Sequence, residues 1–200
     1  MPERLTLGID VGTSATKVLL LNQDLTWEMG SWPSSVDLWS NLRTWLGERG
    51  KKIGRVGITT HGPSAIVIRD GQLCGRIIPW HEDIPEECQR PTEGEHQLPN
   101  TRAWVPSRLA QWEMENGPIA DGVAIQLKDL YNWELTEVIA RDRRSMRGYS
   151  FDSHTHLPAE VIGNVTANGS ELSGISEGAE VICGCDDLTA GVIGLGAKEG

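Results

Sequence analysis

The chain is poor in phenylalanine and tyrosine, and it lacks long apolar runs. It has one Phe and two Tyr against eight Trp, so the aromatic volume of a core must come mainly from tryptophan. No run approaches the ~18 apolar residues that a membrane-spanning helix requires, so we expect no such helix. The first residues lead directly into an apolar strand and lack the architecture of a signal peptide, which predicts a cytoplasmic protein.

Basic residues are also under-represented, and this limits the partners. The sequence carries 18 Lys and Arg against 28 Asp and Glu, a formal net charge of −10. Such a surface repels phosphate backbones and anionic lipid, so we expect neither nucleic acid nor a membrane as a main partner. With 200 residues and 38% apolar content, the chain is long enough for one sizeable domain, or at most for two small ones.

The four cysteines do not have the Cys-x-x-Cys spacing of common zinc sites. Cys183 and Cys185 share one face of a predicted strand, so a structural zinc site there is the alternative to free thiols. We expect free thiols, because two ligands on one strand do not complete a tetrahedral site.

Apolar runs and turn residues predict the order of elements. Strands are expected at residues 5–10, 17–21 and 25–29, forming a meander, and then at 53–59, 65–68, 74–78 and 181–184. Helices are expected after an N-cap at Ser35 and at residues 107–114, 125–139 and 187–195, with a long loop at 82–104 and irregular chain at 140–180. This order is typical of the ribonuclease-H-like, or actin-like ATPase, fold, an α/β fold whose mixed sheet is flanked by helices.

The segment Gly8–Ser14 places Asp-Val-Gly-Thr-Ser directly after an apolar strand. Gly12 allows close approach of the backbone to a phosphate, and the turn amides with the hydroxyls of Thr13 and Ser14 can donate to phosphate oxygens. Asp10 is suited to Mg²⁺ through its waters. Lys17 can add positive charge or simply face solvent. An ordinary hairpin with Asp and Gly in its turn is the alternative.

A second motif, Gly184–Gly191, runs from an apolar strand through two carboxylates into a helix of small residues. Carboxylates at a helix N-terminus are stabilised by its dipole, so capping by Asp186 or Asp187 is one interpretation. A carboxylate held there can also accept the proton of a substrate hydroxyl as it attacks phosphorus.

These two motifs together resemble the FGGY carbohydrate kinase family, which includes xylulose, gluconate and glycerol kinases. The resemblance runs over nearly the whole chain. It includes Val56–Thr59 followed by an apolar strand, Ile78–Trp80 before the expected substrate pocket, Lys128–Leu130 with its helix, and the stretch from Gly178 to Gly194. It implies that residues 1–200 are the N-terminal substrate-binding domain of a sugar or polyol kinase that uses ATP and Mg²⁺, with a C-terminal nucleotide-binding domain absent from this chain. The fragment alone is then expected to be inactive.

Carried across, the resemblance implies a role for each matching residue. Asp187 would be the general base that activates the sugar hydroxyl, and Asp10 would help to place Mg²⁺. The transferred phosphate would be held by Gly12, Thr13, Ser14 and Lys17. Trp80 would stack on an apolar face of the sugar.

Several pocket residues depart from the family pattern. The segment His61–Pro63 replaces the Gln-Arg-Glu of glycerol kinases and the Gln-Met-His of xylulokinases, so neither substrate is supported. His61, His81 and Asp83 are candidates for hydrogen bonds to a polyol, or are plain loop residues. Further candidates for the pocket are Trp104 and Asp129. Trp104 can equally be a core residue, and Asp129 can simply pair with Lys128 on a helix.

Two other functions stay open on the sequence. One is a truncated, non-catalytic sugar-binding or regulatory module with the same fold. The other is an actin-like ATPase of another branch, which the Trp80 pocket argues against. The sugar and the oligomeric state, a homodimer included, are not determined by the sequence.

Overall fold

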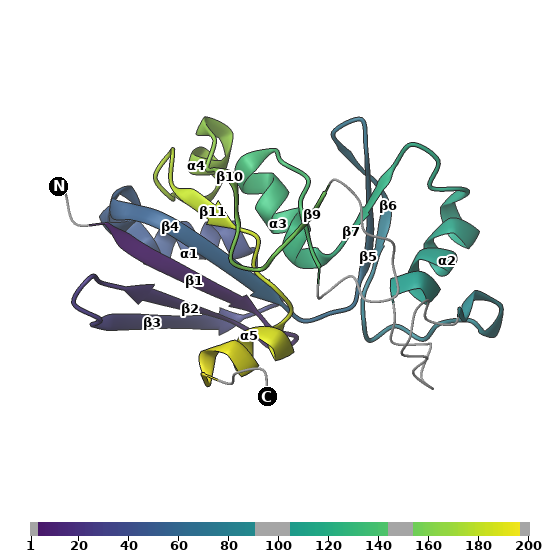
Figure 1. Cartoon of the computed structure of the whole chain (residues 1–200), viewed down its shortest axis with the longest axis horizontal. Coiled ribbons are helices and arrows are strands. Elements are labelled where there is room, and N and C mark those ends of the chain that lie inside the picture. The colour runs from purple at the N-terminus through teal and green to yellow at the C-terminus, as the bar shows by residue number, and fades with distance from the viewer. Residues whose placement is uncertain (1–3, 91–104, 144–153, 197–200) are drawn as a thin grey trace.

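A computed structural model describes residues 4–90, 105–143 and 154–196 (Figure 1). The first three strands, β1 (Leu5–Val11), β2 (Ala15–Leu21) and β3 (Trp27–Pro33), form the predicted antiparallel meander. The third strand begins two residues later than expected and extends to Pro33. Leu25 has a left-handed backbone (φ 67°) and belongs to the preceding turn, which the Asn22 amide closes on the Thr26 carbonyl at 2.8 Å.

These strands belong to a six-stranded mixed sheet of order β10-β11-β4-β1-β2-β3. β4 (Ile53–Thr60) and β11 (Glu180–Ile182) run parallel to β1, whereas β10 (Val161–Asn164) is antiparallel to β11. The carboxyl ends of β1, β4 and β11 therefore meet at one edge of the sheet, which is where α/β folds usually bind their ligands. The predicted α/β class with a mixed sheet is confirmed.

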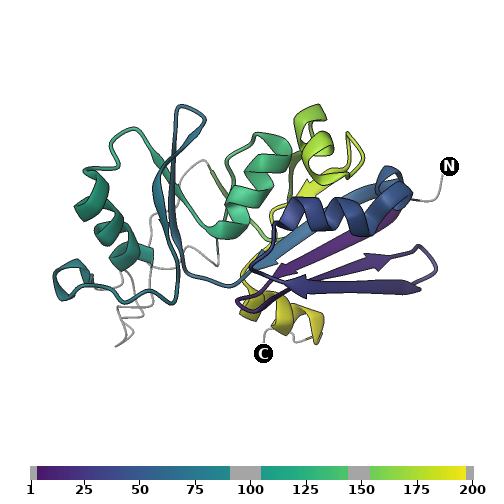
Figure 2. The ribbon, with the colours of Figure 1, turned by 180° about the vertical axis from the view of Figure 1, so that it is seen from behind.

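One face of this sheet is covered by α1 (Leu38–Leu46), α3 (Leu127–Thr136) and α4 (Ala167–Ser173). Figure 2 shows α1 lying across the strands. Leu42 is fully buried against them, as the helical spacing predicts. Trp39 joins α1 to α3: its ring meets that of Tyr131 edge-on at 5.7 Å, and its indole nitrogen donates to Glu134 at 2.7 Å. Tryptophan thus supplies much of the aromatic packing.

The N-cap of α1 is Asp37, and the prediction of Ser35 is wrong. The Asp37 carboxylate accepts a hydrogen bond from the Ser40 amide at 2.6 Å. Both residue types are good N-caps, so local sequence did not distinguish them. A 3₁₀ helix, η1 (Gly47–Lys52), follows α1 and leads into β4.

A second, three-stranded antiparallel sheet of order β6-β5-β7 lies beside the first (Figure 1). It contains β5 (Ala65–Arg69), β6 (Gln72–Ile78) and β7 (Val123–Ile125) and packs on α2 (Val105–Asn116) and the 3₁₀ turn η2 (Glu86–Cys88). The predicted helix at 125–139 is too long at both ends. Ile125 belongs to β7, where it pairs with Ile66 of β5. At the other end, Glu137 adopts a left-handed conformation (φ 60°), so α3 ends at Thr136.

The expectation of irregular chain at 140–180 is also wrong. This stretch contains β8 (Arg141–Asp142), β9 (Thr155–His156), β10 and α4. β8 and β9 have two residues each, and β10 has four, which is too short for a readable alternation. They are fixed by contacts with distant chain, such as the hydrogen bond from the Arg141 amide to the His154 carbonyl at 2.7 Å.

The final helix, α5 (Asp187–Gly194), lies at the other face of the large sheet and buries none of its residues. β11 is shorter than the predicted strand at 181–184, because Gly184 turns the chain with φ 72°. Among the described residues no helix is long and apolar enough to cross a membrane. None of the four cysteines forms a disulfide, and the described part of the chain holds no cluster of three or more metal-ligating side chains.

Candidate functional site

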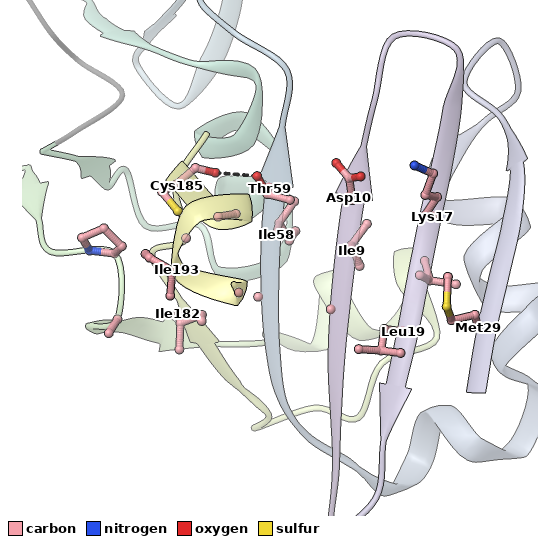
Figure 3. A pocket seen from close by; sticks show the side chains of 18 residues that line it. Ile9, Asp10, Lys17, Leu19, Met29, Ile58, Thr59, Ile182, Cys185 and Ile193 are labelled. Carbon is pink, nitrogen blue, oxygen red and sulfur yellow. Dashed lines mark hydrogen bonds between the residues drawn. The ribbon is translucent and has the colours of Figure 1, made fainter. Parts of the chain in front are cut away.

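Three segments far apart in sequence meet at the carboxyl edge of the large sheet. Asp10 lies near the end of β1, His61 follows β4, and Asp187 begins α5 just beyond β11. Thr60 forms a parallel bridge with Asp186. The Thr59 hydroxyl donates to the Cys185 carbonyl at 2.8 Å, which fixes the start of α5 against β4 (Figure 3). Thr59 was not predicted as a site residue, since a strand-end threonine carries no distinctive signal.

Asp10 is the most unusual acid of this edge. Its Oδ1 is buried and has no hydrogen-bond partner among the described residues. Burial raises the pKa of the Asp10 carboxyl, the Lys17 ammonium lowers it, and the Asp187 carboxylate raises it again. Lys17 lies directly opposite Asp10 in the β1–β2 pairing. A desolvated carboxylate with an unused oxygen, next to a second carboxylate, is a suitable ligand for a cation.

His61 is the neutral partner of these acids. Burial lowers its pKa, and the carboxylates of Asp187 and Asp10 oppose that shift. Because the pKa of His61 lies below the usual histidine value, the uncharged imidazole is favoured at neutral pH. Its Nδ1 is buried without a hydrogen-bond partner among the described residues. An uncharged imidazole with an unused ring nitrogen can exchange a hydrogen bond with a ligand hydroxyl.

Gly12 closes the β1–β2 turn. Its amide donates to the Ala15 carbonyl at 3.1 Å, so this N–H closes the hairpin. A Cβ at position 12 would lie 2.9 Å from the same carbonyl oxygen, which explains the glycine. The Ser34 hydroxyl donates to the Gly12 carbonyl at 2.6 Å. Thr13 and Ser14 are exposed at the tip of the turn, where their hydroxyls can reach a phosphate.

Trp80 connects this turn to the segment after β6. Its indole Nε1 donates to the Thr13 hydroxyl at 3.3 Å, across 67 residues of sequence. Its ring lies 6.4 Å from the His61 ring and 5.8 Å from the His81 ring. Trp80 keeps 39% of its surface exposed. We call Trp80, His61 and His81 the aromatic wall.

The structure assigns different roles to the two carboxylates at the start of α5. Asp186 is the N-cap: its two oxygens accept the Thr189 amide at 2.8 Å and the Thr189 hydroxyl at 3.0 Å. Asp187, the first helical residue, is exposed, and its Oδ1 accepts a hydrogen bond from the Leu188 amide at 2.8 Å. Because Asp186 caps the helix, the carboxylate of Asp187 is not needed for that role.

A cavity of about 540 Å³ lies between α5 and the face of the sheet formed by β1, β2 and β4 (Figure 3). Asp10 and Lys17 line it together with apolar side chains such as Leu19, Met29 and Ile193. In this view the labelled side chains of β1 and β2 lie across the cavity from Ile193 of α5. The carboxyl of Asp10 and the ammonium of Lys17 thus border a largely apolar cavity.

Two predicted site residues, Asp129 and Asp83, make no described contact with this group. Asp129 is fully buried and accepts hydrogen bonds from the Gln126 amide, at 2.9 Å, and from the Lys128 ammonium. It therefore caps α3 and pairs with Lys128, the second of the two interpretations that the sequence left open. Asp83 is exposed next to the buried Ile84, and Trp104 lies outside the described residues.

The Lys128–Asp129 pair contacts the segment that leads to the carboxylates of α5. The Lys128 ammonium donates to the Cys183 carbonyl at 2.9 Å, and the Asn132 amide donates to the same oxygen at 2.9 Å. Cys183 follows β11 and precedes the two carboxylates of α5. Sequence reasoning missed this support, because a Lys-Asp pair on a helix usually faces solvent.

The fold is similar to that of solved carbohydrate kinases. The chain matches a carbohydrate kinase from Novosphingobium aromaticivorans (TM-score 0.73, 17% identity), covering 96% of this chain and 51% of the other. It matches a xylulose kinase from Rhodospirillum rubrum (0.74, 19%; 96% and 52%) and a gluconate kinase from Lactobacillus acidophilus (0.74, 17%; 98% and 50%). The chain thus spans about half the length of these kinases. No protein-family model matches it, and a search of curated sequences gives no significant match.

Proposed function

We propose that residues 1–200 form the substrate-binding domain of an ATP-dependent sugar or polyol kinase. The observation that carries this proposal is the meeting of Asp10, Asp187 and the aromatic wall at one strand edge of a sugar-kinase fold. Because identity to the solved kinases is below 20% and coverage is half of their length, the activity rests on the site and not on the likeness.

The aromatic wall suits a carbohydrate. The exposed face of Trp80 is available for the apolar C–H face of a sugar ring or polyol chain, and neutral His61 can bond a hydroxyl. His81 and Asp83, both exposed in the same segment, are further hydrogen-bonding candidates. An aromatic platform with polar groups at its edge is a common design for small polar ligands.

Asp187 is proposed as the general base. Its exposed carboxylate lies close enough to Asp10 and His61 to affect the pKa of both. A sugar hydroxyl held by the wall can therefore pass its proton to Asp187 while its oxygen attacks phosphorus. Phosphoryl transfer depends mainly on such positioning and on charge stabilisation.

Asp10 fits the Mg²⁺ that such a reaction uses. Its buried, unpartnered Oδ1 is the donor that a hard cation prefers. When bound, Mg²⁺ neutralises charge on the phosphates of ATP. The hydroxyls of Thr13 and Ser14, with the charge of Lys17, are proposed to hold the transferred phosphate at the same edge.

Replacing Trp80 by alanine tests the sugar-binding part of the proposal. We expect the affinity for the sugar to fall by roughly 10- to 100-fold, because a stacked Trp that is removed typically costs a few kcal/mol. The measurement is isothermal titration calorimetry of the chain with pentuloses, hexonates and polyols.

The control is Trp27→Ala, which removes a tryptophan that is 61% exposed on the edge strand β3, away from the aromatic wall. This variant is expected to bind as the wild type does. If both variants lose the same affinity for the sugar, or if Trp80→Ala loses none, Trp80 does not contact the sugar.

A further inference from the structure

Arg108 is a buried cation that the proposed chemistry does not use. It lies on α2, only 2% of its surface is exposed, and burial lowers the pKa of its guanidinium, which Glu82 opposes. A buried charge is costly unless nearby groups compensate it. The groups that compensate Arg108 are therefore informative about its role.

Those groups are the backbone carbonyls of one turn. Arg108 Nη1 donates to the carbonyls of Pro79 and Glu82, the latter at 3.2 Å, and Nη2 donates to the carbonyl of Trp80. The Glu82 amide closes the same turn on the Pro79 carbonyl at 3.2 Å. One guanidinium thus holds three carbonyls of the four-residue segment that carries Trp80 and His81.

The side chain of Glu82 connects the same turn to β6 and α2. It accepts two hydrogen bonds from Arg76, at 2.6 and 2.7 Å, and one from the Gln111 amide at 2.7 Å. Arg76 also bonds Glu115 of α2 at 2.7 Å. Arg108 and Glu82 thus both connect the turn to α2, so the second sheet and α2 hold the segment that carries two residues of the aromatic wall.

We propose that Arg108 is the positioning residue that orients Trp80 and His81 for the sugar, through the three carbonyls of the turn. The expected effect of Arg108 on sugar affinity rests on the proposed function. Its expected effect on the conformational stability of the turn does not. The planar fork of arginine serves several acceptors at fixed angles, and lysine offers only a compact ammonium. We therefore expect that the shape of the guanidinium, and not only its positive charge, is required at position 108.

Arg108→Lys is the test variant, and two readouts are taken on the chain. Hydrogen exchange of the amides at residues 80–84 is expected to become about tenfold faster, because the turn opens more often. The dissociation constant for the best sugar of the panel is expected to rise about tenfold, because Trp80 is no longer held in its binding orientation.

Arg69→Lys is the matched control. Arg69 likewise donates to two carbonyls of a turn, those of Pro118 at 3.2 Å and Ile119 at 2.6 Å, but this turn precedes β7 and carries no wall residue. This variant is expected to leave both the exchange at residues 80–84 and the sugar affinity unchanged.

A double-mutant cycle separates positioning from general destabilisation. If Arg108 acts through Trp80, Arg108→Lys should change sugar affinity by less than about twofold once Trp80 is alanine. An additive loss would overturn the inference. If Arg108→Lys does not fold, Glu82→Gln loosens the same turn from its other side and is expected to give the same pattern.

Failure of this inference is distinguishable from failure of the proposed function. A wild-type chain that binds no sugar contradicts the proposed function, and the exchange of residues 80–84 still decides whether Arg108 holds the turn. Unchanged exchange in Arg108→Lys overturns the positioning role, even where sugar binding is retained.

Discussion

Replacing Asp187 by asparagine is expected to lower the kcat of sugar phosphorylation by roughly 100- to 10,000-fold, the usual contribution of a general base. The amide keeps the size and the helix position of the carboxylate but cannot accept the proton. Affinity for the sugar should change little, because the aromatic wall supplies most of the contacts. The measurement is steady-state kinetics with ATP, in a protein that joins this chain to a nucleotide-binding half.

The neighbouring variant Asp186→Asn is the control for this result. Asp186 accepts two bonds from Thr189 as the N-cap of α5, and asparagine is about as good an N-cap as aspartate. Its kcat is expected to stay within about threefold of the wild type, since a cap change of this kind is small. Retained activity in Asp187→Asn would show that Asp187 is not the general base. A large loss in Asp186→Asn alone would indicate Asp186 as the base instead.

Replacing Lys128 by methionine is expected to lower the free energy of unfolding by about 3–5 kcal/mol, the usual cost of leaving a buried charge unpaired. The side chains of Lys128 and Asp129 are each only 1% exposed. Methionine fills a similar volume but leaves the Asp129 carboxylate without its cation. It also removes one of two donors to the Cys183 carbonyl. Urea denaturation followed by circular dichroism measures the loss.

Two comparisons make this prediction specific. Lys51 pairs with Glu48 on the surface, with side chains 75% and 87% exposed, so Lys51→Met should cost no more than about 1 kcal/mol. Adding Asp129→Asn to Lys128→Met should recover part of the loss, because the uncompensated charge is removed. Equal effects of the two lysine variants would show that the buried pair is not the source of the stability.

The opening meander and the acids at both ends of the chain could be predicted because their signals are local. Apolar strands followed by Asp10 and by the Asp186–Asp187 pair are readable in any window of the sequence. The same holds for Leu42 of α1, whose helical spacing correctly indicated burial.

What could not be predicted depends on tertiary contacts. Val123–Ile125 forms a strand only because β5 is available to pair with it. Asp129 was a candidate for the pocket or for a pair with Lys128, and only the fold reveals that it is buried in the first turn of α3. Arg108 carries no motif, and its relation to Trp80 appears only when α2 packs beside the turn at residues 79–82.

The most direct measurement of the central claim is ATP consumption in the presence of a panel of pentuloses, hexonates and polyols. The chain is joined to a nucleotide-binding half, Mg²⁺ is supplied, and sugar phosphate is quantified together with ADP. We predict that one class of carbohydrate stimulates ADP release, with one sugar phosphate formed per ADP. ATP hydrolysis that is independent of every carbohydrate would contradict the account and indicate an actin-like ATPase, and sugar binding without any phosphoryl transfer would indicate a non-catalytic sugar-binding module.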